Sequence, residues 1–349
     1  MHIPDGYLSP ATCAAAYAAA LPVWAVALRR VKRLLQSRLV PLLAVVSAFC
    51  FVVMMFNLPI PGGTTAHAVG MGLAAVLLGP WAASLAISIA LLIQALFFGD
   101  GGLTTFGANC LNMAIVGSFA SYAVYRLLAG RAPLQARRRV VAAAVAGYAG
   151  INMAAFLAAC EFGLQPLLFH DAAGTPLYAP YPLGVALPAM MLAHLTLAGA
   201  AEAVIAAGVV AYLQRSNPSL LEAPLLGGSG LRWGSLRSLW IGLGALMVCS
   251  PLGLLAAGTA WGEWAPGDLQ NAGIRQQIAR ASSDVAPPVH VPAGLERLAG
   301  LWHAPLPDYA PAFLHNATVG YAVSAMVGCG LILLLLAALS ALWRGGRSA

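Results

Sequence analysis

Charged residues are rare in this 349-residue sequence: only 8% of its residues are charged, whereas 60% are hydrophobic. Between Leu39 and Tyr125 the only formally charged residue is Asp100. A mean hydropathy of +0.82 is typical of an integral membrane protein and excludes an ordinary soluble domain. The basic residues gather in short clusters between apolar runs, a pattern that sets membrane topology and argues against nucleic-acid binding.

Several chemical motifs are absent as well. The only lysine, Lys32, follows Val31, so the chain has no G-x-x-x-x-G-K-[ST] loop for the phosphates of ATP. The chain also lacks the H-E-x-x-H and G-x-S-x-G motifs, and we therefore do not expect an enzyme. Six cysteines stand singly in apolar segments without a C-x-x-C pair, and we interpret each as a small buried hydrophobic residue.

The apolar runs predict an all-α integral membrane protein with about nine transmembrane helices. The basic clusters between the runs place the N-terminus outside the cell and the C-terminus in the cytoplasm, in the inner (cytoplasmic) membrane. The third run is short for a full span, but omitting it would break the alternation of the charges. The nine runs cover roughly residues 11–28, 39–56, 65–79, 81–98, 105–128, 139–160, 183–213, 237–258 and 319–343.

The composition changes between Leu213 and Arg237, where Asn-Pro, Ala-Pro and Gly-Gly-Ser-Gly are typical of a linker. We therefore predict a membrane domain at 1–220, a cytoplasmic linker at 221–236 and a two-helix module at 237–343. The outer loop of this module, 259–318, is short and broken by prolines, which favours a small excursion between two helices over a folded domain.

The first two residues, Met1 and His2, carry the donor set of a metal chelator. The α-amine, the deprotonated amide of His2 and its imidazole Nδ1 can form fused five- and six-membered rings around one ion. Three nitrogens in a plane leave one corner of a square open, a geometry that suits Ni(II), Cu(II) or low-spin Co(II) rather than zinc or magnesium. The alternative is that His2 is an ordinary disordered terminal residue.

A second nitrogen donor is predicted on the same outer side, in the loop 57–67. Its prolines and glycine pair exclude a regular helix, and Thr64 or Thr65 can cap the helix that follows. His67 then lies in the first turn of that helix, at the outer edge of the membrane. A histidine there is either hydrogen-bonded and neutral or a metal ligand, and beside Met1-His2 it becomes the fourth nitrogen.

Other polar residues have two interpretations each. The run around Asp100, Gly-Asp-Gly-Gly, is either a turn chosen for its backbone freedom or part of a loop, 99–106, that closes over the site and attracts cations. Asn109 is either a hydrogen-bond partner of the site or a packing residue. His194 and Glu202 lie two helical turns apart, and a carboxylate inside a membrane segment requires a partner or a cavity.

Three stretches together resemble the CbiM/NikM family, the substrate-capturing membrane components of energy-coupling-factor (ECF) nickel/cobalt transporters. They are Met1-His2-Ile3-Pro4-Asp5-Gly6-Tyr7-Leu8, the Gly-Thr-Thr-Ala-His run ending at His67, and the segment from His194 to Leu213. The resemblance covers about residues 1–220. It implies a metal held by the amine of Met1, the amide and imidazole of His2, and the imidazole of His67.

The segment Ser238–Leu342 resembles the NikN or PDGLE-type accessory subunit, here fused in one chain. The likeness rests on Leu252-Gly253-Leu254-Leu255, Trp261-Gly262-Glu263-Trp264, Pro292-Ala293-Gly294-Leu295-Glu296 and Asp308-Tyr309. Ala293 departs from the name-giving motif, which has Asp at that place. The resemblance further implies two partners, an ECF-type transmembrane coupling protein and ATP-binding subunits, in addition to membrane lipid.

The sequence therefore predicts the metal-capturing component of an ATP-driven uptake transporter, with no cofactor and with Ni²⁺ or Co²⁺ as the transported ligand. Four nitrogens serve both metals, and the PDGLE-like tail favours nickel. One alternative is a membrane metal sensor or chaperone that binds without transporting, and a weaker one is a membrane hydrolase that uses His194 and Glu202. Residues predicted to support or gate the site are Asp5, Thr64, Thr65, Asp100, Asn109, His194 and Glu202.

Overall fold

The computed structural model describes residues 1–35, 40–221 and 236–345, and these residues are predominantly helical. The longer helices are α1 (Pro10–Leu35), α2 (Val40–Met54), α3 (Met71–Ile93), α5 (Gly117–Ala129), α6 (Arg137–Leu168), α8 (Gly199–Ser216), α9 (Arg237–Cys249) and α12 (Ala317–Gly345). The shorter ones are α4 (Phe106–Asn109), α7 (Leu183–Ala193), α10 (Ala272–Ala281) and α11 (Ala293–Ala299). In the described ranges the strands are β1 (Leu58–Ile60) and β2 (Thr64–Ala66), which form one antiparallel hairpin. Nearly all of the predicted linker, 221–236, lies outside the described residues.

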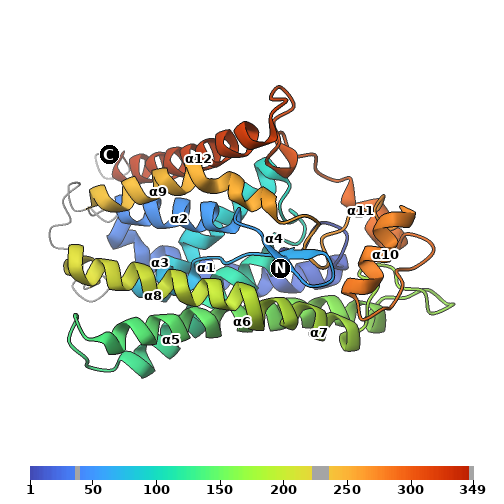
Figure 1. Cartoon of the computed structure of the whole chain (residues 1–349), viewed down its shortest axis with the longest axis horizontal. Helices are drawn as coiled ribbons and strands as arrows, with labels where there is room; N and C mark the ends of the chain where they lie inside the picture. The colour runs from blue at the N-terminus through green and yellow to red at the C-terminus, as the bar shows by residue number, and fades with distance from the viewer. Residues whose placement is uncertain (36–39, 222–235, 346–349) are drawn as a thin grey trace.

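The long helices lie side by side along the longest axis of the molecule, with α10 and α11 at one end and the C-terminus at the other (Figure 1). Seven helical runs of the described chain are long and apolar enough to cross a membrane: 10–31, 71–98, 106–129, 137–168, 183–216, 237–255 and 317–342. The run α2 is apolar but shorter. A multi-pass helical membrane protein is thus confirmed, whereas the predicted total of nine spans and the predicted sidedness are not.

The run from Met71 to Phe98 does not continue as one straight helix. Gly79 has φ 72° and ψ 167°, outside the helical region, and Pro80, which follows, has no N–H to donate. A straight helix of 28 residues would be about 42 Å long. Yet His67 and Asp100, which flank this run, both lie against His2. The chain therefore reverses at Gly79–Pro80, between the predicted segments 65–79 and 81–98, although residues 65–70 of the first segment lie before the helix.

Small residues let the central helices approach one another closely. A Cβ added to Gly72 of α3 would lie 2.5 Å from the Cα of Gly147 in α6. One added to Gly150 would overlap the Ser121 hydroxyl of α5. Close approach of helix backbones over small residues is the usual packing of membrane helices. It holds the first limb of α3 in the middle of the bundle, where its N-terminal end meets the amino terminus of the chain.

Candidate metal centre

The amino terminus lies inside the helix bundle and not on its surface (Figure 1). Met1 is 2% exposed and His2 is 1% exposed. Asn109 fixes the next residue from both sides, because its Oδ1 accepts the Ile3 N–H at 2.8 Å and its Nδ2 donates to the Ile3 carbonyl at 3.0 Å. The Thr105 hydroxyl donates to the same carbonyl. His2 is therefore held in place through the backbone of its neighbour.

The loop that contains Asp100 wraps around the N-terminal segment. Asp5 accepts hydrogen bonds from the N–H groups of Leu103 and Thr104, at 3.0 and 2.7 Å, and from the Thr104 hydroxyl. A Cβ added to Gly102 would lie 2.4 Å from Asp5, so only glycine fits at this position. Gly-Asp-Gly-Gly can be interpreted either as a turn or as part of a loop over the site, and the two interpretations are compatible. Its glycines permit a turn that brings the loop onto the N-terminal segment.

His2 and His67 lie next to each other. Their ring centroids are 5.0 Å apart and their planes differ by 28°. The Nδ1 of His67 is 2.9 Å from the Ala68 carbonyl, and the geometry fits a ring whose Nδ1 carries the proton. The Nε2 of His67 is buried and has no hydrogen-bond partner among the described residues. A neutral imidazole with a free, buried Nε2 and its other nitrogen on a backbone carbonyl is the usual arrangement of a metal ligand.

The local structure before His67 differs from the sequence prediction. Thr64 and Thr65 belong to β2 and do not cap a helix, because α3 begins only at Met71, behind Gly70 at φ 81°. His67 is consequently not in the first turn of a helix, and at 4% exposed it is buried. The prolines and glycines of the loop form a hairpin, which carries the histidine into the bundle.

Two carboxylates contact the predicted ligands. The amino group of Met1 lies 3.1 Å from Glu263 Oε1, and the Nδ1 of His2 lies 2.7 Å from Asp100 Oδ1. The second contact is close but not aligned as a hydrogen bond. Side-chain donor atoms of His2, Asp100 and Glu263 lie within 4.8 Å of one another. These carboxylates provide negative charge at the place where a cation would bind.

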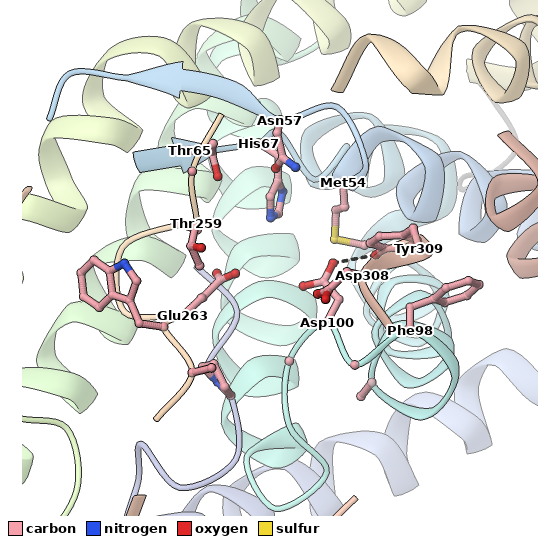
Figure 2. Close-up of a pocket in the computed structure, with 18 of the residues that line it drawn as sticks. Met54, Asn57, Thr65, His67, Phe98, Asp100, Thr259, Glu263, Asp308 and Tyr309 are labelled. Carbon is pink, nitrogen blue, oxygen red and sulfur yellow. Dashed lines mark hydrogen bonds between the residues drawn. The ribbon is translucent and has the colours of Figure 1, made fainter. Parts of the chain in front are cut away.

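A cavity of about 490 Å³ adjoins this cluster. His67, Asp100 and Glu263 face it from different parts of the chain, and Asp308 lies beside Asp100 (Figure 2). Residues of the segment 256–266 line part of the cavity, and no apolar pattern in the sequence associates this segment with the N-terminus. An acidic cavity that leads to buried imidazoles suits a cation more than an anion or an apolar ligand.

Electrostatics at the cavity follow from burial and from neighbouring charges. Burial, together with the nearby charges of His2 and of the amino terminus, lowers the pKa of His67 well below its ordinary value, so its imidazole is neutral. Burial alone would raise the pKa of Asp100, but the neighbouring His2 and the hydrogen bond from the Tyr309 hydroxyl hold that pKa below its usual range. The cavity therefore combines a neutral nitrogen donor with an ionised carboxylate.

The C-terminal part of the chain covers the site, through contacts that the sequence did not predict. The N–H of Thr65 donates to the Thr259 carbonyl at 3.4 Å, and Thr65 pairs with Ala260 in a parallel bridge beside the hairpin. The Tyr7 hydroxyl donates to the Trp264 carbonyl at 2.7 Å. In the sequence, the run Trp261-Gly262-Glu263-Trp264 is distinctive only for its family likeness, and this likeness is the one signal that points to Glu263.

Glu202 and His194 have separate roles. The carboxylate of Glu202 is fully buried and accepts hydrogen bonds from three backbone N–H groups at the start of α3, those of Val69, Gly70 and Gly72, at 2.8, 2.8 and 2.9 Å. It thereby caps a helix whose first turn lies inside the bundle. The Nδ1 of His194 faces the Met190 carbonyl of its own helix at 2.8 Å. Neither contact resembles a nucleophile and its base.

The fold and the site together define a multi-pass membrane protein with a buried amino terminus, two imidazoles and a cation-attracting cavity. Comparison with known proteins identifies the family. The CbiM family model, described as the cobalt uptake substrate-specific transmembrane region, matches residues 2–220, and the PDGLE domain model matches residues 237–345. The chain therefore belongs to the CbiM family of nickel and cobalt transport proteins, which are membrane transport components and not enzymes.

Some relatives match this chain over nearly its whole length, and thus over both the N-terminal and the C-terminal part. The chain is 62% identical to the fused nickel transport protein NikMN of Rhodobacter capsulatus, over 95% of each chain. It is 46% identical to the probable fused nickel transport protein LarMN of Lactiplantibacillus plantarum, over 96% of each. A crystal structure of a truncated transition metal transporter, 56% identical, superimposes with a TM-score of 0.58 and covers 61% of this chain and 98% of its own.

Proposed function

We propose that this protein captures Ni²⁺, with Co²⁺ as the second choice, from outside the cell as the substrate-binding component of an ATP-driven uptake transporter. The ion would be bound by four nitrogens: the amine of Met1, the amide and the imidazole Nδ1 of His2, and the Nε2 of His67. The observation that carries this proposal is the buried amino terminus, which lies beside two adjacent imidazoles in the middle of a membrane bundle.

The separation of the two rings supports a shared ion. Two imidazoles that bind one metal at adjacent corners of a square, through bonds of about 2.0 Å, have ring centres roughly 4.5 Å apart. The centroids of His2 and His67 are 5.0 Å apart, so a small movement of either ring would complete the geometry. A site made of nitrogens alone favours Ni(II) and Co(II) over the harder Mg²⁺ and Ca²⁺.

Binding requires an exchange of partners. The amine and the His2 Nδ1 would leave Glu263 and Asp100, respectively, for the metal. Both carboxylates then remain next to the bound cation as counter-charges. Asp5 and Asn109 would keep the N-terminal segment in place during this exchange, because they bind its backbone or the loop around it and not the donor atoms.

The choice of nickel and of partners rests on the relatives and on the sequence. The full-length relatives are named as nickel transport proteins, and they share the fused C-terminal part. The chain has no phosphate-binding loop motif, so a separate ATP-binding subunit and a transmembrane coupling protein would supply energy for release into the cytoplasm. The acidic cavity and α10 and α11 would then face outside, and the arginine-rich end would face the cytoplasm.

Uptake of radioactive nickel tests the proposal against a sensor or chaperone. Cells that express the chain with a coupling protein and an ATPase should accumulate nickel, and cells that express the chain alone, or His67→Ala with the partners, should not. A sensor or chaperone would bind nickel in detergent but would give no accumulation in any combination. Equal accumulation by wild type and His67→Ala would exclude the four-nitrogen site.

A further inference from the structure

Tyr309, in the C-terminal part of the chain, reaches the site formed by the N-terminal part. Its hydroxyl donates a hydrogen bond to Asp100 Oδ2 at 2.6 Å (Figure 2). The Nε2 of Gln94 donates to the Tyr309 oxygen at 2.9 Å and to the same carboxylate oxygen at 3.2 Å. The other oxygen of Asp100 lies 2.7 Å from the His2 Nδ1. One continuous series of contacts thus leads from Tyr309 to an imidazole of the site.

The backbone that presents this tyrosine is held in an uncommon conformation. Asp308 and Tyr309 have φ values of 54° and 58°, a left-handed region that residues other than glycine rarely adopt. The Ser324 hydroxyl donates to the Tyr309 carbonyl at 2.9 Å. The surrounding structure therefore keeps the chain in a conformation that costs free energy locally but brings the hydroxyl to Asp100.

Packing determines where the ring lies, independently of the hydroxyl. The ring of Tyr309 stacks on Phe98 with centroids 4.8 Å apart and planes 19° apart, and it contacts the edges of Phe51 and Tyr321. Removing the hydroxyl as Tyr309→Phe should leave these contacts unchanged. The aromatic cluster and the hydrogen bond to Asp100 can therefore be separated by experiment.

Tyr321, in the same aromatic cluster, provides a matched control for Tyr309. The Tyr321 hydroxyl also donates a buried hydrogen bond, but its acceptor is the Met55 carbonyl at 2.8 Å and not a group of the site. The Tyr309→Phe and Tyr321→Phe changes remove the same atom from neighbouring rings. Only the first change alters the support of Asp100.

We propose that Tyr309 is a positioning residue of the metal site, which holds Asp100 together with Gln94 so that its free oxygen faces His2. This inference rests on the proposed function, and it assigns to the C-terminal part a contribution to metal binding itself. With Oδ2 held by two donors, the carboxylate remains at the edge of the site after the His2 Nδ1 has left it for the metal, and its charge there balances that of the cation. Outer partners of metal ligands are typically worth about tenfold to a hundredfold in metal affinity.

Nickel titrations of the purified full chain in detergent test this inference. We expect Tyr309→Phe to weaken Ni²⁺ binding about tenfold to a hundredfold, and Tyr321→Phe to stay within about twofold of wild type. Gln94→Met, which removes the other donor to Asp100, should weaken binding in the same direction. In an Asp100→Asn background, Tyr309→Phe should cause little further loss, because the group that it supports is already changed.

Spectra of the Cu²⁺-loaded protein distinguish positioning from a general structural role. Displacement of the Asp100 carboxylate beside the bound copper should change the electron paramagnetic resonance spectrum of Tyr309→Phe, whereas that of Tyr321→Phe should stay unchanged. Unchanged or tighter nickel binding by Tyr309→Phe would overturn the inference, as would an equal loss in Tyr321→Phe or a full further loss in the Asp100→Asn background. Tight binding by His67→Ala would instead contradict the proposed function.

Discussion

Substitution of Glu202 by glutamine should destabilise the protein and also weaken its metal binding. The carboxylate accepts three backbone N–H groups at the start of α3 with both of its oxygens. Glutamine retains one oxygen, which can accept from Val69 and Gly70, but it turns an NH₂ group toward the N–H of Gly72. One buried donor loses its acceptor, and the other two bonds lose the assistance of a full charge. We expect a total cost of about 2–4 kcal/mol.

The measurement is the midpoint of thermal unfolding in detergent, together with a nickel titration. The midpoint should fall by several degrees. Nickel affinity should fall as well, because Val69 and Gly70 lie two and three residues after His67 and the loop that orients this histidine becomes looser. Glu161→Gln is a suitable control, since Glu161 has one side-chain partner, Asn112 at 2.7 Å, whose amide can donate to a glutamine oxygen equally well.

Two outcomes would refute this reasoning. If Glu202→Gln and Glu161→Gln unfold at the same temperature as wild type, the carboxylate does not stabilise the start of α3. If Glu202→Gln lowers the midpoint but binds nickel with unchanged affinity, the cap stabilises the helix without positioning His67.

Two further predictions concern the ligands and the topology. His2→Ala and His67→Ala should each abolish detectable nickel binding by calorimetry while the protein still inserts into the membrane, since each removes a donor from the proposed site; tight binding by either would contradict that site. The topology can be tested in a chain whose exposed Cys249 is replaced by serine. Gly300→Cys should react with an impermeant thiol reagent in intact cells, and Ser216→Cys only after permeabilisation, because the acidic and the arginine-rich ends would face opposite sides of the membrane. Labelling of position 216 in intact cells would reverse the orientation.

The proposed chelating residues could be identified from the sequence because their chemistry is local. Met1 and His2 are adjacent in sequence, and a free amine followed by histidine defines its own ring geometry. His67 followed from its predicted location on the same side of the membrane as the amino terminus, and the structure places its ring beside that of His2. The long apolar helices were predictable from hydropathy, and the break at Gly79–Pro80 lies between the predicted runs 65–79 and 81–98, but the predicted total of nine spans is not confirmed.

The contacts that support the site were less predictable, because the groups that make them are distant in sequence or belong to the backbone. Glu202 was identified as a buried carboxylate, but no side-chain pattern indicates that backbone N–H groups at residues 69–72 are its partners. Glu263 and Tyr309 contact the site from the other end of the chain. Thr64 and Thr65 resembled helix caps because their residue types suit that role, and only the pairing of β1 with β2 shows that they form a strand.

The central claim is that the α-amine of Met1 is a metal ligand, and one insertion tests it most directly. An alanine placed between Met1 and His2, with Met1 retained, moves the amine one peptide unit away from the imidazole and lengthens a segment that is buried at both of these residues. Displacing a donor by about an ångström is costly in a preorganised site. A chain with one alanine added after Ala349 has the same composition and serves as control.

The measurement is nickel uptake by cells that also express the coupling protein and the ATPase, with the amount of inserted protein held equal. The account predicts that the N-terminal insertion stops uptake as completely as His67→Ala does, while the C-terminal addition transports at the wild-type rate. Uptake at the wild-type rate by the N-terminal insertion would show that the amine is not a ligand, and it would contradict the four-nitrogen site.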